Sequence, residues 1–219
     1  MNKRHPKTAL RIIGLSVSLV FVLCSGGWVL RGTALQEKAG NLEPSKKIGY
    51  FSYLYEDAVV AFLVDVELAK MRKTEEYIPL AVQLANKGVQ ALKIKRQSFQ
   101  LLDPSETAYS MPGFKTVEKV YKNYSADAKY YARKVFVEGD VQTSFSSFRK
   151  LQCSFFPHPY KDSVLHDVLI EEVVLPQGTF AEDLLYFPRP KSVVPGQVFR
   201  LRILDEKLEP YAEVGFIVD

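Results

Sequence analysis

The stretch YIPLAVQLANKGVQALKIKRQSFQLLDPSETAY, residues 77–109, decides the fold of this chain. Apolar residues alternate with smaller or polar ones at residues 78–84, as they do in a half-buried strand. Residues 86–88, Asn-Lys-Gly, form a turn signal because Asn and Gly tolerate positive φ. Alternation resumes at residues 92–94 and again at 99–101. We therefore expect three short antiparallel strands, the pattern of a β-sandwich.

Composition and charge limit the class of protein. The chain has 219 residues and 47% of them are hydrophobic, which suffices for the core of one ordinary domain. The net charge of +4 arises at the N-terminus, where Lys3, Arg4, Lys7 and Arg11 precede the first acidic residue. Without these four the chain has as many basic as acidic residues. We therefore expect no nucleic-acid partner.

The N-terminal segment, residues 1–34, predicts the compartment. A basic head is followed by residues 12–30, which carry no charge and approach the ~20 residues that cross a bilayer as a helix. A secretory signal peptide has a similar layout. Either interpretation places the basic residues in the cytoplasm and exports the rest of the chain. We expect an extracytoplasmic, membrane-anchored protein of the cell envelope, periplasmic if the source is bacterial.

Three fates of this segment stay open. Its length and the interfacial Trp28 favour a retained transmembrane anchor. Small residues at 25–27 and 32–34 favour cleavage by a signal peptidase. Cys24 lies in LCSGG, which resembles the lipid-attachment box of bacterial lipoproteins, although Leu23 stands where that box usually has a small residue. Cys24 is thus the candidate lipid anchor.

The remaining chain divides into a linker and one domain. Residues 35–47, with Gly, Pro and few apolar residues, predict a linker, and residues 48–219 predict the domain. Helical i, i+3, i+4 spacing from residue 117 predicts two short helices, with Val120 and Tyr131 facing inward and Ser125 capping the second. They open an excursion at about residues 115–159, and residues 136–160 fit either a helix or a strand.

Strand patterns before and after this excursion complete a mainly β fold. Further strands are expected at residues 62–69, 164–175, 184–187, 198–204 and 211–218. Together with the central stretch they predict an antiparallel, immunoglobulin-like β-sandwich with a short helical insertion, preceded by the N-terminal transmembrane or signal helix.

Four motifs give the chain a family resemblance. They are LAVQLANKG (80–88), FQLLDPSETAY (99–109), LPQG (175–178) and LLYFP (184–188). In this order they resemble the immunoglobulin-like, or telokin-like, domains of bacterial lipoproteins and secreted envelope proteins. The excursion is longer than the usual connection in that family. The resemblance implies an exported, non-enzymatic module for binding or assembly.

Residues suited to catalysis or metal binding are few. The spacing of Cys153, His158 and His166 matches no zinc motif, and the chain contains no G-x-S-x-G elbow and no Gly-rich phosphate loop. We therefore expect no catalytic residue, no metal and no cofactor. The protein is interpreted as non-enzymatic, and an envelope enzyme that uses the excursion, for example through Cys153 and His166, is the least favoured alternative.

The candidate interaction surface lies in the helical excursion. Basic residues alternate there with tyrosines, and we select Lys119, Lys122, Lys129 and Tyr130. Such a surface suits an anionic glycan or a lipid headgroup layer, whereas plain packing of the tyrosines on the sheet also accounts for the pattern. The preferred interpretation is a membrane-tethered β-sandwich that binds an envelope protein or glycan. A carbohydrate or small-solute module using Tyr130 and Phe156 is the main alternative.

Overall fold

The computed structural model describes residues 43–133, 145–151, 153–155, 168–169, 171–191 and 194–218. They belong to one compact unit, Asn41–Asp219. The N-terminal segment at 1–34, with Cys24, lies outside the described residues and stays a prediction, as do His158 and His166. No helix among the described residues is both long enough and apolar enough to span a membrane.

The described chain is mainly β, as the sequence predicts. Its elements, in chain order, are β1 (Lys46–Lys47), β2 (Ser52–Glu56), β3 (Val60–Asp65), α2 (Glu67–Met71), β4 (Tyr77–Asn86), β5 (Leu92–Lys95), the 3-10 helix η2 (Arg96–Ser98), β6 (Phe99–Leu102), β7 (Ala108–Ser110), α3 (Phe114–Val120), α4 (Tyr124–Arg133), β8 (Arg149–Lys150), β9 (Cys153–Ser154), β10 (Val168–Leu169), β11 (Glu172–Leu175), β12 (Thr179–Pro188), β13 (Val198–Leu204) and β14 (Pro210–Ile217).

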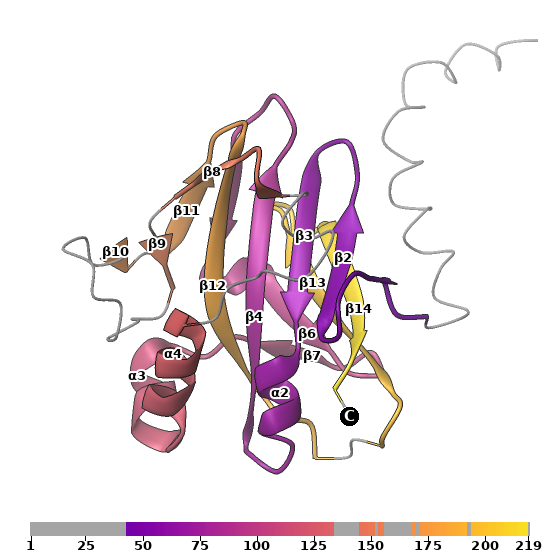
Figure 1. Ribbon diagram of the computed structural model, residues 1–219, viewed down its shortest axis with the longest axis vertical. Coiled ribbons are helices and arrows are strands. Elements are labelled where there is room, and N and C mark those ends of the chain that lie inside the picture. Colours follow the sequence, from indigo (N-terminus) through magenta and orange to yellow (C-terminus); the bar gives the residue numbers. More distant parts are fainter. Residues whose placement is uncertain are drawn as a thin grey trace, which may run out of the picture. The chain divides into compact units, whose positions relative to one another are not determined.

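Two sheets form the body of the domain. The larger has the strand order β1-β2-β3-β4-β12-β8 and the smaller has the order β14-β13-β6-β7. Neighbours within both are antiparallel, except for the short parallel pair of β8 and β12. Strands β5 and β11 form a separate antiparallel pair, and β9 and β10 a short parallel one. In Figure 1, β3, β4 and β12 lie in front of β6, β13 and β14.

The core lies between these sheets. Alternate residues of β3, β4, β6, β13 and β14 point into one apolar cluster. Ring pairs join the layers: Tyr53 with Phe216, 6.4 Å between centroids, and Phe62 with Phe99, 6.5 Å. Strand β4 is buried on both faces, because helices and loops cover the outer face of the larger sheet. Burial of this apolar area is the main stabilising contribution to the domain.

The three central strands form as predicted but do not pair with one another. Strand β4 lies between β3 and β12, β5 pairs with β11, and β6 lies between β13 and β7. The turn at residues 86–88 therefore carries the chain away from the larger sheet instead of closing a hairpin. Alternation shows which face of a strand is buried, but it does not show which strand lies beside it.

A second difference concerns residues 67–69, for which the alternation predicts a continuing strand. There the chain turns into α2, whose Leu68 and Ala69 are buried. Asp65 directs this change, because its carboxylate accepts hydrogen bonds from the Glu67 amide (3.1 Å) and the Ser52 hydroxyl (2.8 Å). A short polar side chain that binds nearby backbone competes with the strand ladder.

Two of the resemblance motifs meet at the end of the domain where β4 stops. Asn86 is fully buried, and its amide nitrogen donates to the carbonyl oxygens of Gln90 (2.8 Å) and Leu175 (2.9 Å). Its side-chain oxygen accepts from the Gly88 amide (2.9 Å), and its carbonyl accepts from the Gly178 amide (2.9 Å). One side chain therefore fastens the 86–88 turn to the 175–178 turn.

The chain enters the domain along its last strand. The Ser45 amide donates to the Gly215 carbonyl (2.8 Å), and the Gly215 amide donates to the Ser45 hydroxyl (2.9 Å). A Cβ at Gly215 would lie 3.2 Å from the Glu43 carbonyl oxygen, so glycine permits this close approach. Lys46 and Lys47, expected in the linker, form β1 against β2. The structured domain thus begins earlier than the predicted residue 48.

Candidate functional site

The predicted helix pair is present as α3 and α4, beside β12 and near α2 (Figure 1). Gly113 precedes α3, and its carbonyl accepts from the Thr116 amide (3.0 Å). Helix α4 begins at Tyr124, where the Asn123 carbonyl accepts from the Asp127 amide (2.9 Å). Ser125 lies inside the first turn, so the prediction that it caps α4 is wrong.

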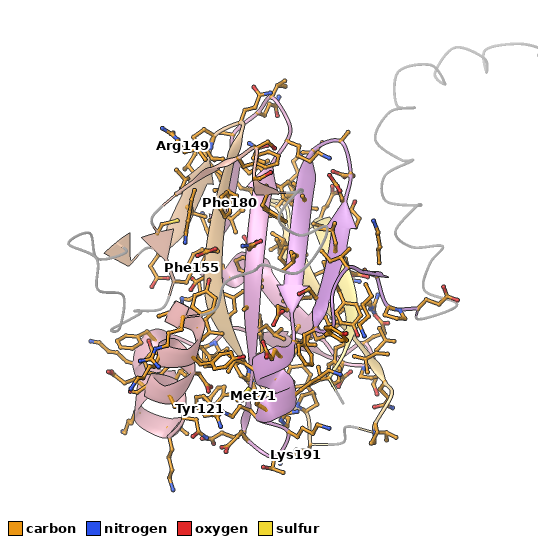
Figure 2. The ribbon with its side chains drawn as sticks, in the orientation of Figure 1. Met71, Tyr121, Arg149, Phe155, Phe180 and Lys191 are labelled. Carbon is orange, nitrogen blue, oxygen red and sulfur yellow. The ribbon has the colours of Figure 1, made fainter. Side chains whose placement is uncertain are left out.

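The inner face of the helix pair is built from tyrosines. Tyr121, Tyr124 and Tyr131 are buried, and Tyr121 lies between the helices and the sheet (Figure 2). The Tyr121 ring packs edge-on against Tyr77 of β4 (5.6 Å) and Tyr186 of β12 (5.7 Å). Tyr186 also packs against Tyr124 (5.5 Å). These contacts confirm the predicted packing of the tyrosines on the sheet and hold both helices against it.

A buried carboxylate fastens the same face. Asp127 of α4 has no exposed surface, and its Oδ2 accepts from the Tyr121 hydroxyl (2.6 Å). Its Oδ1 accepts from Nε of Arg72 (2.8 Å), the residue that follows α2. Burial raises the pKa of Asp127, and the hydrogen bonds from Tyr121 and Arg72 offset part of the shift. Arg189 donates to the carbonyls of Arg72 (2.8 Å) and Glu75 (2.7 Å), so the loop that holds Arg72 is also fixed.

Sequence reasoning missed Asp127 and Arg72, yet one signal was present. Asp127 lies three residues after Tyr124 and four before Tyr131, so helical spacing places it on the apolar face. A carboxylate on an apolar face requires a partner, because an unpaired buried charge is costly. The sequence offers no indication that Arg72, 55 positions earlier, is that partner.

The outer face of the helix pair carries the predicted interaction residues. Lys119, Lys122 and Lys129 are all exposed. Tyr130 is partly buried, and its hydroxyl donates to Glu67 of α2. Burial, and to a smaller extent this hydrogen bond, raises the pKa of Tyr130 to about 12. Together with Ala126 and Arg133, Lys129 and Tyr130 line a broad, open depression on α4. The structure thus brings Lys129 and Tyr130 together and places Lys119 and Lys122 on and just after α3.

Charge on this outer face is strongly unbalanced. Between Phe114 and Arg133 the exposed ionisable residues are one acid, Glu118, and five bases: Lys115, Lys119, Lys122, Lys129 and Arg133. The second acid of this stretch, Asp127, is buried and paired with Arg72. Four excess positive charges therefore face solvent within twenty residues, on a domain whose net charge is close to zero and whose remaining residues are net acidic. Like charges on one fixed surface attract anions from solution.

Val120 and Tyr131, both expected on the inner face, lie on different faces of the helix pair. Val120 is 44% exposed, whereas Val117 provides the apolar contact of α3, so the inward orientation predicted for Val120 is wrong. Tyr131→Ala should lower the free energy of unfolding by about 2 to 4 kcal/mol, since it empties a buried site. Val120→Ala should change it by less than about 0.5 kcal/mol. Paired thermal melts test both values, and equal losses would contradict this assignment of faces.

The second candidate region surrounds Cys153. Its side chain is half-buried and borders an apolar cavity of about 20 Å³ between β12 and the β5–β11 pair, together with Phe155, Phe99 and Leu175. Such a volume holds no more than one water molecule. The described residues contain no cluster of His, Cys, Asp and Glu suited to a metal. The predicted alternatives that use His166 or Phe156 lie outside the described residues.

Comparisons with known proteins add little beyond the fold description. No family model and no curated protein matches the chain. Among solved structures, the candidate lipoprotein ycdA of Bacillus subtilis aligns over 75% of this chain and 38% of its own, with 12% identity and a TM-score of 0.35. The yjhA protein of Bacillus subtilis aligns over 76% of this chain and 96% of its own, with 9% identity and a TM-score of 0.35. The aligned region thus spans well under half the length of ycdA, and these values assign the chain to no family.

Proposed function

We propose that this protein is an extracytoplasmic, non-catalytic β-sandwich module, held at the membrane by its N-terminal segment, which binds another component of the cell envelope through α3 and α4. The N-terminal segment supports the location, since a basic head precedes nineteen uncharged residues. Cys24 remains the candidate lipid anchor. The immunoglobulin-like assignment belongs to the same proposal, supported by the contact between the 86–88 and 175–178 motifs.

The observation that carries the proposed function is the two-sided construction of the helix pair. Its inner side is fixed by Asp127, Arg72 and the buried tyrosines, while its outer side holds exposed lysines. A surface whose backbone is already fixed loses little conformational entropy when it binds. The lysines are therefore presented on a preorganised support, which favours a role in binding over a role in folding.

Neutralising the lysines should separate binding from stability. The change of Lys119, Lys122 and Lys129 to Gln should alter the free energy of unfolding by only a few tenths of a kcal/mol for each residue, since exposed charges contribute little. The same variant should lose at least tenfold in affinity for isolated envelope material, measured by co-sedimentation of the full-length chain at low salt.

A matched control removes the same charge elsewhere. Lys46, Lys47 and Lys93 are exposed on β1 and β5, and their change to Gln should leave co-sedimentation unchanged. Equal losses in both variants would show that net charge, and not the helix pair, governs the association. Full retention of binding by the helix variant would refute the proposed surface.

A further inference from the structure

We propose that the exposed face of α4 binds an anionic glycan, a sugar polymer that carries carboxylate or phosphate groups. This inference rests on the proposed function, and it names the class of envelope component together with the centre of its site. The centre is the open depression that Ala126, Lys129, Tyr130 and Arg133 line.

The charges of this depression select an anion. Lys129 and Arg133 are four positions apart on one helix, which places them about 6 Å apart along its axis and on the same side. A guanidinium donates two parallel hydrogen bonds to one carboxylate or phosphate, and a neighbouring ammonium adds a point charge. No acid is among the residues that line the depression, and the acid beside it, Glu67 of α2, accepts the hydrogen bond of the Tyr130 hydroxyl.

The arrangement of apolar side chains favours a glycan over a membrane surface. A helix that lies on a bilayer turns its large apolar residues toward the lipid. Here three of the five aromatic residues face the sheet: Tyr121, Tyr124 and Tyr131 are each 5% exposed or less. Val120 is the single large apolar residue of the described helix pair with substantial exposure, at 44%. The outer face thus lacks the apolar surface that would enter a lipid layer.

Tyr130 supplies an aromatic ring, which a sugar polymer can contact and a simple polyanion does not need. It lines the depression between the two cations in sequence, and its hydroxyl is held by Glu67 of α2. This bond restricts the orientation of the ring. An aromatic side chain with an apolar body and a fixed orientation gives a contact surface at low entropic cost, as in other recognition sites.

The test uses the purified full-length chain and defined polymers. We expect it to bind polygalacturonate or phosphorylated dextran in a salt-sensitive manner and not to bind neutral dextran. The double change Lys129→Gln and Arg133→Gln should weaken this binding about tenfold, whereas Lys46→Gln with Lys93→Gln should not. Tyr130→Ala should also weaken glycan binding, and Tyr130→Phe, which retains the ring, should preserve most of it. Thermal melts of each variant confirm that the fold persists.

Three results would overturn the inference. Binding to phosphatidylglycerol vesicles without binding to either glycan would identify a lipid surface instead. Equal affinity for poly-glutamate, unaffected by Tyr130→Ala, would identify unselective attraction of polyanions. Absence of binding to every polymer would refute the inference that the ligand is an anionic glycan. If the chain still co-sedimented with envelope material, the proposed function would stand with another partner. Loss of both would refute the inference and the proposed function together.

Discussion

Asp127→Ala is expected to lower the free energy of unfolding by about 3 to 5 kcal/mol. Its removal leaves the Arg72 guanidinium without its carboxylate and the buried Tyr121 hydroxyl without an acceptor. Breaking a buried ion pair on one side costs this much because the remaining charge is uncompensated. Arg72 is 22% exposed, so partial solvation should place the loss toward the lower end. Urea unfolding followed by circular dichroism measures it.

The matched variant for Asp127→Ala is Tyr121→Phe. It removes one hydroxyl and keeps the ring that packs on Tyr77 and Tyr186. It should cost about 1 to 2 kcal/mol, since it deletes a hydrogen bond to a charged group but leaves the pair with Arg72 intact. If Asp127→Ala were no more costly than Tyr121→Phe, the carboxylate would not be the group that fastens α4 to α2.

Asn86→Ala is expected to cost about 3 to 5 kcal/mol. It leaves the Leu175 carbonyl without its buried donor, which costs about 1 to 3 kcal/mol. It also removes the part-buried hydrogen bonds to the Gln90 carbonyl and from the Gly88 amide, of which the Gly88 amide still donates to the Val59 carbonyl. Water can reach the exposed part of this turn, so we expect less than the full sum. Thermal unfolding of the purified chain measures the loss.

Lys87→Ala, one residue further, is the control for Asn86→Ala. Lys87 forms an ion pair with Glu56 (2.6 Å), in which the two side chains are 29% and 40% exposed. Exposed pairs contribute at most about 1 kcal/mol. A loss for Asn86→Ala as small as that for Lys87→Ala would show that the two turns are held together by other contacts.

Local patterns in the sequence predict where strands and helices form better than they predict which strands pair with one another. Alternation identified β4, β6 and β13, and helical spacing identified α3 and α4, because each pattern reports which face of one element is buried. The partner of β5 could not be predicted in this way. Its alternation fits β11 as well as β4, and only the complete packing of the sheets decides between them.

The candidate site shows the same division. The exposed lysines of α3 and α4 followed from composition and spacing, whereas the side chains that fix these helices did not. Arg72 belongs to a polar connection between α2 and β4 that looks like an ordinary surface loop in the sequence. Its role depends on the position of α2, and α2 itself was predicted as part of a strand. An error in one local element thus concealed a contact between two distant ones.

The path by which the chain enters the domain has a mechanical consequence. A pull on the residues before Glu43 reaches the domain at Ser45, which is hydrogen-bonded to Gly215 of β14. Strand β14 is in turn paired with β13 from Val198 to Leu204. The load would therefore pass into the C-terminal strand as well as into the two-residue ladder of β1. Tension on the N-terminal side would be shared by both ends of the polypeptide, so a Gly215→Val variant should yield at a lower force in single-molecule stretching.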